Sequence, residues 1–343
     1  VWSSDNTIDI TWVDAIDSHS GLDGYSVVWD TNPTTVPLAI KDIEEGVLGC
    51  TSQPMPDSNS VYFHIRAVDN LGNWGTTVHR GPYFIDTTPP TMVPIIEAEE
   101  EFYSQAPVFS VFRFEDNLGI NRGWYQVDAT TGDWIPIFTS APGTLWSGDG
   151  WVLPDFDALA DGLHTIYFRA SDDCGNIGGG SGEWSWRFVK DTQPPTLPSS
   201  LTSTSHTVQT WSNVSTITVT WNESVDSLSG LDGYSYLWTD NPASIPDAFK
   251  NIGTGVGQLT SPPLPDGNNL YFHIRAADTA GNWTTTVHLG PFYIDTEPPS
   301  MTALLEVEGR YYATAPSFET FEFHDNVALD EVWYAVDSYT GTW

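Results

Sequence analysis

The sequence predicts an all-β protein built from tandem antiparallel β-sandwiches. Strand-forming Val, Ile, Thr, Tyr and Trp dominate the apolar runs, and no long segment has a helical period. The 343-residue chain repeats itself at a spacing of 209 residues. Pro-Pro pairs interrupt it at intervals of about 100 residues, the size of one sandwich. Hydrophobic residues make up 40% of the chain, which is enough to build cores and excludes a disordered chain.

The internal repeat is the strongest signal in the sequence. A shift of 209 residues places Trp2 on Trp211 and Trp134 on Trp343 without a gap, and about half of the aligned residues are identical. Residues 20–26 recur whole as residues 229–235. The sequence therefore predicts a tandem duplication, arranged as a string of beads.

Three Asp-Thr-x-Pro-Pro segments, at residues 86–90, 191–195 and 295–299, divide the chain. Two consecutive prolines fix φ and remove two donors, so a strand ladder cannot continue through them and the segment becomes a stiff connector. We therefore predict four modules, with boundaries at residues 1–86, 87–191, 192–295 and 296–343.

The first and last modules are predicted to be truncated. The first has no counterpart of residues 194–210, and the last stops where its sister continues through residues 135–191. This favours a window on a longer repeat protein. The alternative is that a neighbouring chain supplies the missing strands.

Individual strands and turns fit this plan. Apolar and polar side chains alternate in residues 7–12, in their copy 216–221 and in residues 61–67, as in half-buried antiparallel strands. An Ala-x-Asp-x-x-Gly-Asn segment begins at Ala67, Ala170 and Ala276. We interpret it as the tight turn of the last hairpin, because Asp opens turns and Gly accepts a positive φ.

Charge excludes several classes of function. The chain has 45 Asp and Glu against 11 Lys and Arg, a formal net charge of -34. A nucleic-acid binder needs a basic face, and anionic lipid would repel this chain. No run of about 18 apolar residues exists, so no membrane insertion is expected. The acidity favours metal cations, solubility at high salt or repulsion between neighbours.

No enzyme chemistry is visible. We find no nucleophile with a partner base and no phosphate-binding loop. Two cysteines, Cys50 and Cys174, cannot form a disulfide framework, and the acids beside Cys174 make it a poor nucleophile. We therefore expect no catalytic activity.

Particular residues resemble known families. The first and third modules resemble bacterial and archaeal fibronectin type III-like domains, and the second and fourth resemble bacterial Ig-like repeats. The fibronectin-like residues are Trp12, Tyr25, Ala67, Asp69, Gly72, Asn73 and Trp74 with their copies; the Ig-like residues are Asp116, Asn117 and residues 161–164 and 170–176. The resemblance implies extracellular or cell-surface spacers, adhesins, filament proteins or modules of secreted enzymes, and it carries over no catalytic residue.

Calcium at the joints is the most specific chemical hypothesis. In an Ig-like sandwich the linker enters beside the B–C and F–G loops, so each linker Asp should meet acidic loops of the module that it enters. Carboxylate and carbonyl oxygens are the ligands that calcium prefers. The candidate ligands are Asp86, Asp116, Asn117, Asp172 and Asp173; then Asp191, Asp226, Asp232 and Asp278; and finally Asp295, Asp325 and Asn326. The alternative is that these acids only open turns.

The function predicted on these grounds is a structural spacer or fibre segment of a larger extracellular or cell-surface protein, whose partners are neighbouring copies or other surface proteins. One alternative is an adhesin or carbohydrate-binding string; another is a set of accessory domains of a secreted hydrolase. Sugar could stack on exposed tryptophans, although core packing would also explain them. The tryptophans in question are Trp74, Trp146, Trp151, Trp184, Trp186 and Trp283. Three Asn-x-Ser/Thr sequons, which are acceptors for N-glycosylation in a secreted protein, begin at Asn213, Asn222 and Asn282.

Overall fold

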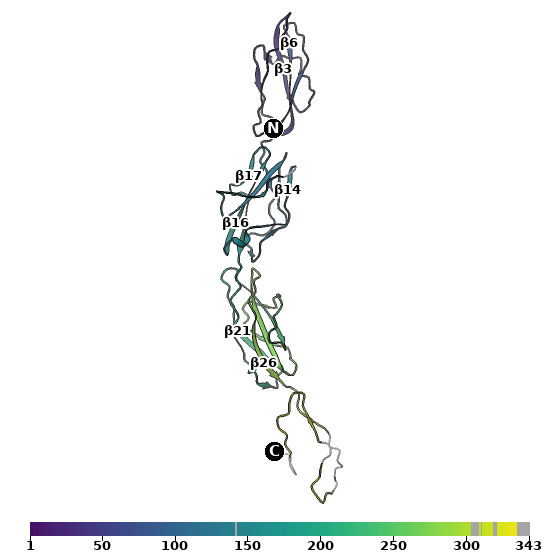
Figure 1. The fold of residues 1–343 in the computed structure, drawn as a ribbon, viewed down its shortest axis with the longest axis vertical. Helices are drawn as coiled ribbons and strands as arrows, with labels where there is room; N and C mark the ends of the chain where they lie inside the picture. Colours follow the sequence, from purple (N-terminus) through teal and green to yellow (C-terminus); the bar gives the residue numbers. More distant parts are fainter. Residues whose placement is uncertain (141–142, 303–308, 310, 318–320, 335–343) are drawn as a thin grey trace. The chain divides into compact units, whose positions relative to one another are not determined.

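The computed structural model describes residues 1–140, 143–302, 309, 311–317 and 321–334 (Figure 1). It is 43% strand and 1% helix, which confirms the all-β prediction. In this described part the helix is a single 3-10 turn, η1 (Phe156–Ala158). None of the described helical structure is long and apolar enough to cross a membrane.

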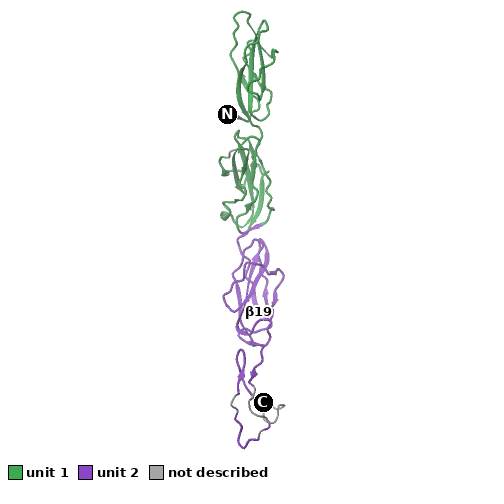
Figure 2. Cartoon of the chain, turned by 90° about the vertical axis from the view of Figure 1, so that its right-hand side faces the viewer, with its two compact units in different colours: residues 1–101, 105–190 green, residues 102–104, 191–343 purple. Residues whose placement is uncertain are grey.

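The chain forms two compact units (Figure 2). The first comprises residues 1–101 and 105–190, and the second comprises residues 102–104 and 191–343. The first unit holds the first two predicted modules except residues 102–104 and Asp191, which belong to the second unit with the other two modules. The division into four modules stays a prediction.

The first module, residues 1–86, contains one large sheet and one small sheet. The small sheet pairs β2 (Asp9–Thr11) with β5 (Gly49–Thr51). Tyr25, Phe63 and Ile65 form the core of the module. The large sheet has the order β1 (Trp2–Ser3), β7 (Val78–Ile85), β6 (Ser58–Asp69), β3 (Leu22–Asp30) and β4 (Ile43–Glu44).

The second module, residues 87–191, has an aromatic core. Phe109, Phe112, Phe168 and Trp186 are each at most 1% exposed and pack ring against ring. Its largest sheet includes β13 (Ile135–Phe138), β12 (Ile120–Val127), β16 (Gly162–Asp172) and β18 (Ser185–Lys190), with β17 (Ile177–Gly179) on β16. A second sheet contains β14 (Leu145–Ser147), β11 (Arg113–Glu115) and β8 (Thr91–Met92), and a third pairs β10 (Val108–Phe109) with β15 (Trp151–Val152). The short strand β9 (Phe102–Tyr103) belongs to the second compact unit.

The third module, residues 192–295, repeats the first and adds a strand. Its large sheet has the order β20 (Trp211–Ser212), β26 (Val287–Ile294), β25 (Gly267–Asp278), β22 (Leu231–Thr239) and β23 (Ile252–Gly253). Its second sheet has the order β19 (Ser199–Ser203), β21 (Thr218–Asn222) and β24 (Gln258–Thr260). The core is larger than in the first module and includes Ile217, Val219 and Trp221.

Each linker leads into a strand that pairs with the next module. After the first linker, β8 pairs antiparallel with β11. After the second, β19 pairs with β21. After the third, β27 (Ser300–Met301) pairs with β28 (Phe323–His324). The Pro-Pro segment thus ends one ladder and places the next strand against the following module.

Candidate functional site: the module joints

The linker aspartates are buried although they carry acidic side chains. Asp86 is 1% exposed and Asp191 is 0% exposed. Each aspartate directly follows the last residue of a strand and lies three residues before a Pro-Pro pair. The backbone on both sides therefore fixes the side chain at the joint. Burying a carboxylate is costly unless nearby groups compensate for the loss of water.

At the second joint the structure brings three of the predicted residues together. Asp191, Asp226 and Asp278 each offer a carboxylate oxygen, and these oxygens lie within 4.8 Å of one another. Asp191 accepts hydrogen bonds from the backbone N–H of Gln193 and of Ser229, each at 3.1 Å. Its carboxylate therefore connects the linker to the loop that contains Asp226.

A single asparagine connects the turn to the linker at this joint. The Nδ2 of Asn282 donates to Asp278 Oδ2 and to the backbone carbonyl of Asp191, both at 2.9 Å. The backbone N–H of Asn282 donates to Asp278 Oδ1 at 2.8 Å. The Ala-x-Asp-x-x-Gly-Asn segment is thus a turn, as the sequence indicated, and it also holds the preceding linker.

The first joint uses the same arrangement. Asn176 Nδ2 donates to Asp172 Oδ2 at 2.6 Å and to the Asp86 carbonyl at 2.8 Å. Asp86, Asp172 and Cys174 form a second group whose candidate ligand atoms lie within 4.8 Å. Cys174 aligns with Ala280 in the other repeat, so its sulfur is not part of the shared arrangement.

The B–C loop aspartates keep one carboxylate oxygen turned away from their own loops. Asp226 Oδ1 accepts from the backbone N–H groups of Ser229 and Gly230, both at 2.9 Å. Asp116 Oδ1 does the same with Leu118 and Gly119. In the described part of the chain, Asp116 Oδ2 is buried without a hydrogen-bond partner. Asp116, a predicted ligand, nevertheless lies outside the group that Asp86 and Asp172 form.

Burial, together with nearby like charges, raises the pKa of two of these acids. Burial, and then repulsion from Asp116 and Asp172, raises the pKa of Asp86 to about 6. Burial also raises the pKa of Asp278, against the hydrogen bonds from Asn282 and with repulsion from Asp191. Both shifts oppose ionisation of these two carboxyl groups, and a cation bound beside either one would reduce its shift.

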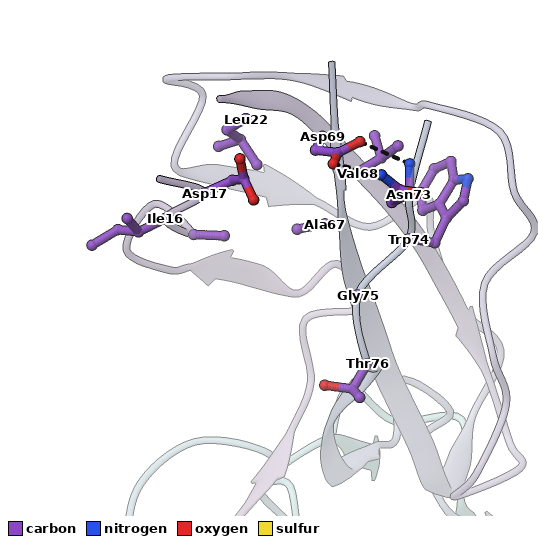
Figure 3. A pocket seen from close by; sticks show the side chains of 11 residues that line it. Ile16, Asp17, Leu22, Ala67, Val68, Asp69, Asn73, Trp74, Gly75 and Thr76 are labelled. Atoms are coloured by element: carbon purple, nitrogen blue, oxygen red, sulfur yellow. Dashed lines mark hydrogen bonds between the residues drawn. The ribbon is translucent and has the colours of Figure 1, made fainter. Parts of the chain in front are cut away.

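The copy of this turn in the first module behaves in the opposite way. Asp69 accepts the same bonds from Asn73, and these bonds, the side-chain bond first, lower the pKa of Asp69 to about 2. Asp69 has no linker aspartate beside it within the described chain. Asp278 differs from Asp69, which Figure 3 shows beside Asn73, mainly in its burial, and then in the repulsion from Asp191 and Asp226.

Other predicted ligands lie elsewhere. Asp232 forms an ion pair with Lys250, with Asp232 Oδ1 and Lys250 Nζ 2.6 Å apart, and it is not in the Asp191 group. Asp173 is likewise outside the Asp86 group. Asn117 Nδ2 donates to Asp57 Oδ2 at 2.8 Å, so Asn117 uses its amide nitrogen here and does not belong to the Asp86 group.

At the third joint the described residues form no such group. Asp295 Oδ1 is buried without a hydrogen-bond partner in the described chain. Asp325 Oδ1 accepts from the backbone N–H of Val327 and Ala328. Asn326 donates to Asp266 at 2.8 Å. These three predicted residues thus lie at the joint without converging.

Sequence reasoning missed Asp57 and its copy Asp266. Asp57 accepts hydrogen bonds from Thr87, Thr88 and Asn117. Asp266 accepts equivalent bonds from Thr296 and from the next module. Burial alone would raise the pKa of Asp57, but the hydrogen bonds, led by that of Thr88, lower it to about 2. The available signal was the Pro-Asp dipeptide that both copies share.

The tryptophans weighed as sugar platforms are engaged in packing. Trp186 is 1% exposed, and Trp146 stacks on Phe138 with ring centroids 4.3 Å apart. Trp151 packs on Phe112 at 5.1 Å. Trp74 and Trp283 lie beneath arginine guanidinium groups, each at 4.6 Å, and Trp184 packs on Phe114.

The three glycosylation sequons differ in how far their asparagine side chains are engaged. The amide nitrogen of Asn282, which glycosylation would use, donates hydrogen bonds to Asp191 and Asp278, whereas Asn213 and Asn222 are exposed.

A cross-strand histidine pair occurs in each repeat. The two Nδ1 atoms lie 2.6 Å apart in the pair His64 and His79, and also in the copy His273 and His288.

The two cysteines are free thiols. Burial, and then repulsion from Asp172 and Asp86, raises the pKa of Cys174 to about 11. The thiol is therefore protonated at neutral pH, which agrees with the expectation that it is a poor nucleophile.

Comparison with known proteins finds similar solved structures but no related family. No family model matches the chain, and no curated protein matches it. Among solved structures, the chicken CNTN1 FN1–FN3 domains are similar at 14% identity and a TM-score of 0.29, covering 84% of this chain and 95% of that chain. The fibronectin(III)-like modules of Clostridium thermocellum CbhA are similar at 12% identity and a TM-score of 0.23, covering 55% and 87%. The fold class of this chain rests on its own strand pairing and cores.

Proposed function

We propose that this chain is a non-catalytic spacer segment of an extracellular repeat protein, and that its joints resist bending. The observation that carries the proposal is the repeated joint: an asparagine of one module holds the linker carbonyl, at Asp86 and again at Asp191. Domains joined by flexible linkers move relative to one another and make no fixed contacts at the linker. The same contacts at two successive linkers therefore favour stiff joints.

The stiffness proposed here has three sources. Two prolines restrict the linker backbone. The asparagine amide fixes the linker carbonyl to the turn of the next module. Asp57 joins the loop before β6 to Thr87 and to Asn117, and Asp266, in the loop before β25, does the same at the third joint.

We further propose that calcium occupies the Asp191, Asp226 and Asp278 group. The support is chemical: three carboxylates converge, two of them buried, and the linker carbonyl lies nearby. A divalent cation would offset their mutual repulsion. The first joint offers Asp86 and Asp172, with Asp116 repelling Asp86 from close by; the Cys174 sulfur is a poor ligand for a hard cation.

Calcium can be tested on the full chain by calorimetric titration and thermal unfolding in EDTA, in millimolar calcium and in molar potassium chloride. We expect saturable binding and a rise in melting temperature that potassium does not reproduce. Asp226→Asn should remove the second-joint site, whereas Asp232→Asn, a control outside the group, should leave it unchanged. Equal effects of calcium and potassium would mean that only charge screening acts, and the calcium proposal would fail.

The spacer proposal has its own test. Spin labels placed on the two sides of the Asp191 joint report the width of the distance distribution between them. We expect a narrow distribution that broadens in Asn282→Ala. A broad distribution in the unmodified chain, unchanged by the substitution, would contradict a stiff joint whether or not calcium binds.

A further inference from the structure

An exposed apolar ridge, residues 36–40, recurs as residues 245–249 in the third module. In the first module it contains Val36, Leu38 and Ile40, which are 59%, 73% and 60% exposed. A shift of 209 residues places Ile245 on Val36 and Phe249 on Ile40, and these two are 66% and 72% exposed. The residue types differ between the copies, yet both positions stay apolar and open to solvent. Apolar side chains that gather on an exposed surface mark interaction sites.

The first ridge lies beside an open strand edge. β3 pairs with β4 only through Gly24 and Tyr25, and the ladder ends where Val27 N–H donates to Asp42 Oδ2 at 2.9 Å. In the part of the chain that the structure describes, the sheet ends at β4, so the rest of this side of β3 has no neighbouring strand (Figure 1). A groove of about 260 Å³ is lined by residues of both the strand and the ridge, including Val27, Val28, Val36, Pro37, Leu38 and Ile40.

The third module has the same open edge. On this side β22 pairs with β23 only through Gly233 and Tyr234. Beyond them, Tyr236 N–H donates to Asn251 Oδ1 at 3.1 Å, and Asn251 is the copy of Asp42. A side chain therefore ends the ladder at the equivalent place in both repeats, and each ridge has an open edge beside it.

Charge limits what can cover the ridges. Residues 31–40 contain no charged side chain, and residues 241–249 contain one, Asp247. Because the whole chain has a net charge of -34, a basic partner would gain most from acidic surface elsewhere and little from a ridge. A second copy of this chain is repelled by that acidic surface, so an uncharged ridge is where two copies can approach at low electrostatic cost.

The repeat favours a second copy for an independent reason. Each compact unit carries one ridge and one open edge, and the two ridges are 209 residues apart in the sequence. Two copies of one chain have the same separation between these surfaces, so two contacts can form together. The second contact then benefits from the effective concentration that the first creates.

We propose that the two ridges, with the β3 and β22 edges beside them, are the surface through which a second copy of this chain associates. Each ridge places its apolar side chains against a ridge and groove of the other copy, and water leaves both. Burial of apolar side chains drives the contact, and repulsion between two acidic chains opposes it. The association goes beyond the spacer proposal, because neither the joint contacts nor a bound cation takes part in it.

Sedimentation equilibrium of the full chain in EDTA tests this association. We expect a reversible dimer whose dissociation constant falls as potassium chloride is raised to molar concentration, because salt screens the repulsion. EDTA removes any contribution from calcium at the joints, so a failure here leaves the calcium proposal untouched. A chain that stays monomeric at every concentration and salt level would overturn the proposal.

Two substitutions locate the contact. Ile40→Asp and Phe249→Asp should each raise the dissociation constant about tenfold or more, because each removes an apolar side chain from the contact, and the double variant should be monomeric. Leu163→Asp is the matched control: Leu163 is 57% exposed in the second module, and the change adds the same charge outside both ridges. Thermal unfolding should be unchanged in all of these variants, since the substituted positions are exposed. A double variant that dimerises as the unmodified chain does would refute the proposal, as would a loss equal to that in the control.

Hydrogen exchange tests the strand edges separately. Because alternate residues of a strand turn their backbone groups to the same side, Trp29 and its copy Trp238 are the next residues at the open edges. Their amides should exchange more slowly in the dimer than in the monomeric double variant. A dimer that protects other amides and leaves these two unchanged would place the contact on another surface and overturn the proposal.

Discussion

The side-chain amide of Asn282 lies 2.9 Å from the backbone carbonyl oxygen of Asp191, 91 residues earlier in the chain. The same bond joins Asn176 to Asp86 at 2.8 Å. An amide has two hydrogens, and each asparagine uses the other on the aspartate of its own turn. One side chain thus closes the turn and fixes the linker.

Asn282→Ala should destabilise the second unit by about 1–3 kcal/mol, because it leaves the buried Asp278 carboxylate and the Asp191 carbonyl without this donor. Urea unfolding measures the change. Asn73→Ala is the matched control and should cost less, since Asn73 donates its side chain to Asp69 alone within the described residues. Equal losses for both substitutions would show that the linker contact contributes nothing.

Asp86→Asn should stabilise the first unit at pH 7 in EDTA. The folded-state pKa of about 6 exceeds the ordinary value of 3.8, so stability from this group is present below pH 4 and is lost as the pH rises through 6. A neutral amide removes that loss, by about 1–3 kcal/mol at pH 7. The variant should also respond less to calcium. Thermal unfolding at pH 4 and pH 7 separates the effects, and an advantage that did not grow with pH would refute this account.

His273 should make the second unit less stable in mild acid. Burial, and then repulsion from His288, lowers the pKa of His273 to about 4. Between pH 6.5 and 4 the unfolded chain binds the proton and the folded chain does not, so stability falls as the pH falls through this window, by up to about 1.4 kcal/mol per pH unit. Urea unfolding across the window measures the slope. His273→Gln, which cannot titrate, should show a shallower one.

Gly233→Ala should cost about 2 kcal/mol or more. Gly233 has a φ of +152°, and an added Cβ would lie 2.2 Å from the Ile252 carbonyl oxygen, where β22 pairs with β23. Gly253→Ala is the control, because a Cβ there meets no atom within 4 Å. Denaturant unfolding compares the two variants, and similar costs would mean that the close approach is easily relieved.

The sequence predicts the fold class well because its evidence is local. Alternation of apolar side chains and the position of Pro-Pro pairs depend on neighbours in the chain, as in residues 7–12 and 86–90. The encounter of Asp191 with Asp226 and Asp278 was also predictable, since the entry of a linker beside two particular loops follows from the sandwich topology.

Other contacts at the joints needed three-dimensional information. Asp232 is close to Asp226 in sequence, but it lies on a strand where Lys250 reaches it. Asn117 was expected to offer an oxygen, yet its amide meets Asp57 from the preceding module, 60 residues earlier. No spacing rule relates loops at opposite ends of successive modules, so the only local signal for Asp57 was its Pro-Asp dipeptide, which recurs at Asp266.

The division of each joint between two modules has a consequence for how such a chain can grow by gene duplication. Asp57 and Asp86 are encoded in one module, and their partners Asn117 and Asn176 are encoded in the next. Copying the first module alone would place Asp57 against a loop in which Ser18, and not an asparagine, follows the loop aspartate, so the bond that Asn117 makes would have no counterpart. Copying a pair of modules keeps every junction intact, and 209 residues is the length of such a pair. The heritable unit of this architecture is therefore the joint together with both of its neighbours.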